Sequence, residues 1–179
     1  MGRDLSLNIR RTAIFGLVFI AAIAMLAAAC GGGDTKVAPE PDPDPGANAA
    51  PGNVEDPPAG ATQVDVQLVE FKVVPDPESV PAGTIYFLAG NNGGEAHELV
   101  IVRSDVAPGD LPVGDDGRIP EDEIDLVDEI EPFSAGSDAS IALDLEPGAY
   151  VLLCNIAEEE GGEIESHYQK GMFAAFTVE

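Results

Sequence analysis

Apolar residues in the C-terminal two-thirds of the chain occur in short runs that are bounded by Gly, Pro and Asn. The segment 64–73, VDVQLVEFKV, alternates apolar and polar positions, which is typical of a strand with one buried face. Its alternation shifts near Val69 and Glu70, which predicts a bulge or bend there. Further strands are predicted at PAGTIYFLAGN (81–91), HELVIVRSD (97–105), DLVDEIEPF (125–133), ASIALDL (139–145), PGAYVLLCN (147–155) and MFAAFTVE (172–179).

This spacing of strands and turns predicts an all-β fold, a Greek-key β-sandwich of about seven to eight strands. The predicted domain covers residues 62–179, a length that can enclose one core. A polar insertion separates two of the strands, and a short helix is expected in it near Glu121 to Leu126.

The segment 30–61 has a different composition, rich in Pro, Gly, Ala and Asp and without apolar periodicity. Such a segment cannot bury enough apolar surface to fold alone, so we expect a disordered, extended tether. It would hold the domain away from whatever anchors the N-terminus.

Residues 1–29 have the order of a secretory signal, with Arg3, Arg10 and Arg11 before an apolar run that ends in small residues. The run finishes as LAAAC followed by GGGD, which resembles a bacterial lipoprotein signal. That resemblance implies cleavage before Cys30 and a lipid on its sulfur, although Ala27 stands where such signals usually carry leucine. An ordinary cleaved signal or an uncleaved anchor, with Cys30 incidental, stays open.

The formal net charge of −25 argues against nucleic acid and anionic lipid surfaces as partners. A basic protein partner would suit this charge. The acidic residues could equally form a solvated surface that binds no partner. The net charge therefore argues against two classes of partner but does not identify the partner.

Sulfur and imidazole are scarce, because the chain has two histidines, two cysteines and three methionines. Beyond the predicted signal and Cys30 these are His97, Cys154, His167 and Met172. Blue copper sites use two His nitrogens, one Cys thiolate and a weak axial Met, so the inventory matches such a site with nothing left over. His97 begins a predicted strand, Cys154 ends another and Met172 begins the last, which would bring the four to one end of the sandwich.

The motifs around these residues resemble those of the cupredoxins, the family of blue copper proteins. The matching segments are NNGGEAHELVIV (91–102), PGAYVLLC (147–154) and HYQKGMFAAFTV (167–178). The resemblance implies one type 1 copper held by His97, Cys154 and His167 with Met172 as axial ligand. It also implies that His167 lies near the surface as an electron port. The twelve residues 155–166 between Cys154 and His167 depart from the few found in many small cupredoxins.

The function that follows is a membrane-tethered extracytoplasmic electron carrier, exported and held at the outer face of the membrane or in the periplasm. A redox protein, either a cytochrome or a membrane oxidase or reductase, would be its partner. An enzyme is not expected, since a reductase or oxidase on this fold needs further copper centres and further histidines. The alternatives are a copper storage, delivery or resistance protein and a metal-free surface lipoprotein.

Side chains around the predicted site are expected to adjust it. Tyr168 and Phe133 should pack against it rather than bind metal. Acidic residues of the long loop should add negative charge close by and favour Cu(II) over Cu(I). These acidic residues are Glu158, Glu159, Glu160, Glu163 and Glu165.

Overall fold

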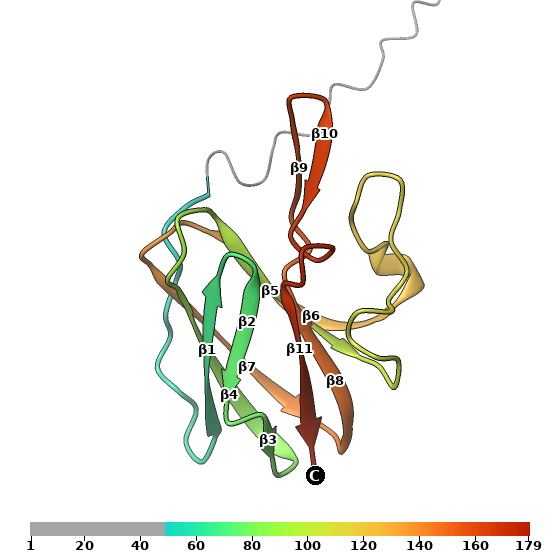
Figure 1. The fold of residues 1–179 in the computed structure, drawn as a ribbon. Coiled ribbons are helices and arrows are strands. Elements are labelled where there is room, and N and C mark those ends of the chain that lie inside the picture. The colour runs from blue at the N-terminus through green and yellow to red at the C-terminus, as the bar shows by residue number, and fades with distance from the viewer. Residues whose placement is uncertain (1–48) are drawn as a thin grey trace, which may run out of the picture. The chain divides into compact units, whose positions relative to one another are not determined.

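The computed structural model describes residues 49–179 (Figure 1). The predicted signal at 1–29, the predicted lipid site Cys30 and residues 30–48 of the predicted tether lie outside the described residues. In the part that is described, no helix is long and apolar enough to cross a membrane.

The first sheet has four strands in the order β2-β1-β4-β7. Strands β1 and β4 pair in parallel, while β1 with β2 and β4 with β7 pair antiparallel. The strands are β1 (Thr62–Val69), β2 (Lys72–Asp76), β4 (Gly83–Asn91) and β7 (Asp138–Leu145).

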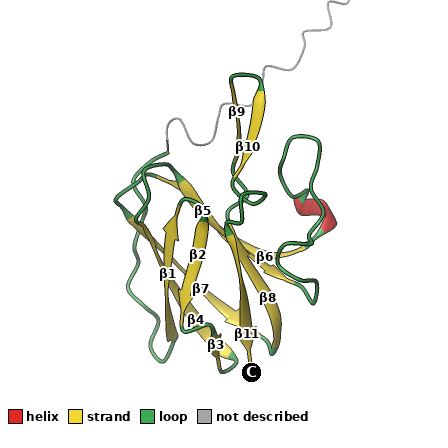
Figure 2. Cartoon of the chain, viewed as in Figure 1, coloured by secondary structure: helices red, strands yellow, loops and turns green. Residues whose placement is uncertain are grey.

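The second sheet has five strands in the order β3-β11-β8-β5-β6. The strands are β3 (Ser79–Val80), β11 (Phe173–Val178), β8 (Gly148–Leu153), β5 (His97–Arg103) and β6 (Asp125–Phe133). Figure 2 shows the two sheets as the bulk of the described chain, and the predicted all-β sandwich is confirmed.

The core lies where the inner faces of the two sheets meet. Val64, Val66 and Leu68 on β1 are buried while the residues between them are exposed, as the alternation predicted. Phe87 of β4 and Phe176 of β11 bring the sheets together with ring centroids 5.4 Å apart. The same apolar cluster includes Cys154 and Met172, so the predicted ligands continue the core rather than sit on its surface.

A second apolar cluster covers the outer face of the five-stranded sheet. Val100 and Val102 of β5 pack there with Leu111 and Ile119 from the polar insertion and with Tyr168. Strand β5 is therefore buried on both faces, which accounts for its unbroken apolar run. The insertion acts as a cover for the sheet.

Two local expectations differ from the structure. The predicted single strand with a bend near Val69 and Glu70 is a hairpin, since β1 ends at Val69 and β2 begins at Lys72. The helix expected near Glu121 to Leu126 is a 3₁₀ turn, η1 (Glu121–Glu123), because the chain extends again at Ile124 to enter β6. Pairing of Asp125 with Arg103 in the sheet outweighs local helix propensity.

Residues 50–55, which belong to the predicted tether, are hydrogen-bonded to the sandwich. The carbonyl of Ala50 accepts from the Ser134 N–H at 2.9 Å, and the Tyr86 hydroxyl donates to the Glu55 carbonyl at 2.7 Å. Backbone and hydroxyl hydrogen bonds need no apolar periodicity, so the sequence carried no signal for this contact.

The sequence also missed a small hairpin within the loop 155–166. It consists of β9 (Ala157–Glu160) and β10 (Glu163–Ser166) and projects beyond the two sheets (Figure 2). Gly161 and Gly162 have φ of 65° and 88°, the two left-handed positions of a tight hairpin turn. Its residues are mostly Glu, so the apolar alternation that reveals a strand is missing.

Candidate metal centre

Adjacent strands of the five-stranded sheet bring three of the predicted ligands to one edge. His97 is the first residue of β5, Cys154 directly follows β8, and Met172 directly precedes β11. Since β8 runs antiparallel to both β5 and β11, the end of β8 lies beside the starts of its two neighbours. His167 reaches the same place from the segment after β10.

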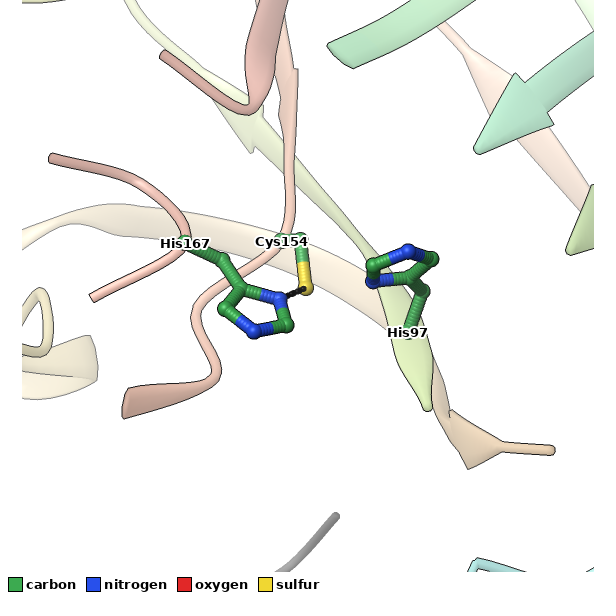
Figure 3. Close-up of side chains that lie close together, drawn as sticks. All are labelled: His97, Cys154 and His167. Atoms are coloured by element: carbon green, nitrogen blue, oxygen red, sulfur yellow. Dashed lines mark hydrogen bonds between the residues drawn. The ribbon is translucent and has the colours of Figure 1, made fainter. Parts of the chain in front are cut away.

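The two histidines and the cysteine form one buried cluster. Their ligand atoms all lie within 4.8 Å of one another, close enough to hold one metal ion together. The Cys154 Sγ atom lies 3.4 Å from His167 Nδ1, and the two imidazole centroids are 5.2 Å apart. Figure 3 shows the two rings on either side of the sulfur.

His97 presents an unpaired nitrogen. Its Nδ1 is buried and has no hydrogen-bond partner, whereas its Nε2 lies 3.2 Å from Glu70 Oε1. Leaving a buried polar atom unpaired costs roughly 1–3 kcal/mol, so such atoms call for an explanation. A metal ion bound at Nδ1 between Cys154 and His167 would satisfy it.

His167 is held on three sides. Its Nδ1 contacts the Cys154 sulfur, its Nε2 lies 3.5 Å from Glu95 Oε2, and the Phe71 ring meets it edge-on at 5.1 Å. The residue is only 1 % exposed, and the Lys170 ammonium lies 4.4 Å from the centroid of the covering Phe71 ring. His167, which was expected near the surface as an electron port, is therefore buried, with the Phe71 ring against it.

Both imidazoles are held in the neutral form that metal ligation requires. Burial, and to a lesser degree the neighbouring His97, lower the pKa of His167 to about 4. Burial also lowers the pKa of His97, although the Glu70 carboxylate opposes that shift. For Glu70, burial raises the pKa of the carboxyl group. Hydrogen bonds from the backbone N–H groups of residues 70, 94 and 95, together with the electrostatic attraction of His97, outweigh burial, so the pKa of Glu70 is lowered.

Cys154 is fully buried, and burial raises the pKa of its thiol, with the nearby Glu98 carboxylate adding to the shift. Without a cation the sulfur is therefore protonated. A soft metal ion would supply the positive charge that stabilises a thiolate in this position, and two imidazoles with one thiolate suit copper. The residues present thus fit a copper ion.

Met172 is brought to the same edge by its backbone. Its carbonyl accepts from the Cys154 N–H at 3.1 Å, and its N–H donates to the His167 carbonyl at 3.0 Å. The residue is 0 % exposed and packs within the main core cluster. Met172 is thus tied to two members of the cluster by hydrogen bonds.

Phe133 and Tyr168, the two side chains predicted to pack against the site, lie in different places. Phe133 is paired with His97 across β5 and β6, as a packing residue should be. Tyr168 turns to the outer cluster, where its hydroxyl accepts from the Leu111 N–H at 3.0 Å and donates to the Pro108 carbonyl at 2.7 Å.

The acidic residues predicted to lie close to the site belong to the projecting β9–β10 hairpin, where Glu165 forms an ion pair with Lys170.

Three carboxylates that the sequence analysis missed lie nearer the cluster. Glu70 and Glu95 contact the two histidines, and Glu98 accepts from the Asn155 N–H at 2.6 Å. Glu98 lies between His97 and the apolar run of residues 99–102, a signal that could have revealed it. Glu70 lies far along the chain from His97, so only the fold brings them together.

Glu98 lines a polar cavity beside the cluster together with Arg118, Glu129 and Asn155. Burial, partly offset by the hydrogen bond from the Asn155 N–H, raises the pKa of Glu98 to about 8. Burial also raises the pKa of Glu129, and nearby carboxylates raise it further. Those carboxylates are Glu121, Glu131 and Asp128.

Comparison with known proteins returns solved structures only, since no family model and no curated protein matches the chain. Reduced auracyanin from the photosynthetic bacterium Roseiflexus castenholzii is 23% identical over 67% of this chain and 99% of that chain, with a TM-score of 0.45. Auracyanin B is 22% identical over 74% and 99%, with a TM-score of 0.47. Rusticyanin from Thiobacillus ferrooxidans, a copper protein, is 20% identical over 73% and 88%, with a TM-score of 0.42.

Similarity at this level carries no functional argument, so the chain's own geometry has to supply it. The two-sheet sandwich and the buried His97, Cys154 and His167 cluster are both present among the described residues. In fold and in this group of soft ligands the chain resembles the cupredoxins, as its sequence motifs predicted.

Proposed function

We propose that this chain is a mononuclear copper protein that carries single electrons, in which His97, Cys154, His167 and Met172 would hold the copper. One observation carries the proposal: His97, whose buried Nδ1 has no hydrogen-bond partner, offers a ligand atom that lies within 4.8 Å of the ligand atoms of Cys154 and His167. Bound copper would supply one-electron chemistry by changing between Cu(I) and Cu(II).

The protein itself supplies a rigid set of ligands that is buried away from water. Strands β5, β8 and β11 set the spacing of the ligand backbone atoms, and a sheet cannot change that spacing without breaking its hydrogen bonds. Burial keeps both imidazoles neutral and excludes water from the cluster. A site that holds its shape in both oxidation states makes electron transfer fast.

The cellular setting is also a proposal. Residues 1–29 would direct export, Cys30 would carry the lipid, and the segment after it would hold the copper domain away from the membrane. The partner would be a cytochrome or a membrane oxidase or reductase. The same ligands would serve a copper storage or delivery protein, which need not exchange electrons quickly.

Copper binding is tested by adding Cu(II) to the purified full chain and recording its visible spectrum. We expect one copper per chain and an intense thiolate-to-copper charge-transfer band. Cys154→Ser and His97→Ala should abolish this band, whereas Cys30→Ser, the matched cysteine variant, should keep it. A wild-type protein that binds no copper would refute the proposal.

Two further measurements separate the carrier from its alternatives. Reversible, rapid voltammetry of the copper-loaded protein supports a carrier, and slow or irreversible exchange favours storage or delivery. Membrane fractionation of cells tests the anchor, because the wild type should partition with membranes and Cys30→Ser should not.

A further inference from the structure

We propose that Glu70 is a positioning residue for the copper site: its carboxylate fixes the orientation of His97 and favours the oxidised metal. This inference deepens the proposed function and rests on it. Glu70 lies in the turn between β1 and β2, in the opposite sheet from His97. The carboxylate therefore links the two sheets at the predicted copper edge.

A single oxygen of Glu70 makes the key contacts. Oε1 accepts from the Gly94 N–H at 2.7 Å and the Glu95 N–H at 3.0 Å, and it lies 3.2 Å from His97 Nε2. An oxygen acceptor at Nε2 places the imidazole proton on that nitrogen. The lone pair is then on Nδ1, the buried atom that has no partner.

The turn between β4 and β5 leaves space for the Glu70 carboxylate. A Cβ atom on Gly93 would lie 2.3 Å from Glu70 Oε1 and 2.8 Å from His97 Nε2, so a side chain at this position would displace one or the other. The Asn91 carboxamide braces the turn by donating to the Glu95 carbonyl at 2.8 Å and accepting from the Gly93 N–H at 3.1 Å. Glu70 thus fits a space that the turn leaves for it.

A carboxylate bonded to the far nitrogen of a metal-binding imidazole increases the basicity of that ligand. It also adds a negative charge near the metal, and both effects favour Cu(II). The Glu70 side chain is 29% exposed, so solvent screens only part of this charge.

The second histidine offers an internal comparison. Glu95 lies 3.5 Å from His167 Nε2, a longer contact than the 3.2 Å of Glu70, and its side chain is 54% exposed. Removing the charge at Glu95 should therefore change the preference for Cu(II) less than removing it at Glu70. Both contacts join a Glu carboxylate to a histidine Nε2, and they differ only in distance and in the exposure of the carboxylate.

The reduction potential of the full copper-loaded chain tests the electronic part. Glu70→Gln keeps an oxygen for Nε2–H but removes the charge, so the preference for Cu(II) over Cu(I) should fall by about tenfold, a rise in potential of about 59 mV. Glu95→Gln should give a smaller rise. Asp65→Asn, an exposed carboxylate at the other end of the same hairpin, should give none. A Glu70→Gln change no larger than that of Asp65→Asn would overturn the inference.

The orientation is tested without copper, by the ¹⁵N chemical shifts of the His97 ring in the copper-free full chain. We expect the proton on Nε2 in the wild type and loss of that single tautomer in Glu70→Ala. A wild-type ring protonated on Nδ1 would overturn the inference even if copper binds. If the chain binds no copper, the proposed function fails, but the tautomer measurement still decides whether Glu70 sets the ring.

Discussion

Replacing Asn155 by alanine should destabilise the protein through two backbone groups of one residue. The Asn155 carboxamide accepts from the Ile119 N–H at 2.7 Å and donates to the Ile119 carbonyl at 3.0 Å. Ile119 is 1% exposed and Asn155 is 7% exposed, so both hydrogen bonds lie away from bulk water. Alanine would leave the N–H and the carbonyl of Ile119 without their side-chain partner.

The magnitude follows from the number of groups affected. A buried donor or acceptor that loses its partner costs roughly 1–3 kcal/mol, so two such groups give about 2–6 kcal/mol. A polar cavity lined by Glu98, Arg118 and Asn155 adjoins this position. Water entering from that cavity could replace part of the lost bonding, so the lower end, about 2 kcal/mol, is the firm expectation.

Urea unfolding of the copper-free full chain measures this free energy. Asn92→Ala is the matched control, because Asn92 is exposed and its carboxamide makes one 3.3 Å hydrogen bond to Gly90. An Asn155→Ala variant within about 0.5 kcal/mol of the wild type, the usual range for surface changes, would refute the reasoning.

Three other changes test the core, the turn and the acidic cavity. Phe87→Ala should lower the unfolding free energy by about 3–5 kcal/mol in urea titrations, since Phe87 is fully buried between the sheets; a loss below about 1 kcal/mol would contradict that packing. Gly93→Ala should weaken copper binding by about tenfold or more in competition titrations by displacing the Glu70 carboxylate, whereas Gly94→Ala, whose Cβ meets nothing within 4 Å, should not; equal affinities would count against a crowded turn. Glu129→Gln should stabilise the protein at neutral pH but not in acid, as urea midpoints would show. The raised pKa of Glu129 means that its ionised form is disfavoured in the fold and that stability falls as pH rises through that pKa; a pH-independent difference would exclude this cause.

The strands were predictable because the spacing of apolar residues in each strand reflects which side chains are buried. Val64, Val66 and Leu68 alternate with exposed residues in β1, and the run that follows His97 is apolar because both faces of β5 are covered. The positions of His97, Cys154 and Met172 relative to strand ends followed from the same pattern. A sheet places such ends side by side wherever antiparallel strands are neighbours.

Contacts made by polar groups across long sequence distances were not predictable. The approach of Glu70 to His97 depends on how the β1–β2 turn meets the opposite sheet, and no local pattern encodes that meeting. The hydrogen bonds of Ala50 and Glu55 to the sandwich leave no periodic trace either. Sequence reasoning therefore located the cluster but missed the carboxylate beside it.

The long segment between Cys154 and His167 is the clearest case in which the fold resolves a sequence-level difficulty. The hairpin of β9 and β10 closes with Ala157 paired to Ser166, and the His167 N–H then donates to the Ile156 carbonyl at 2.9 Å. The hairpin thus leaves and returns at one place, and its residues add no length to the path that separates sulfur from imidazole. Because a closed hairpin of any length would return the chain to that place, the number of residues in this loop does not determine whether His167 can reach Cys154.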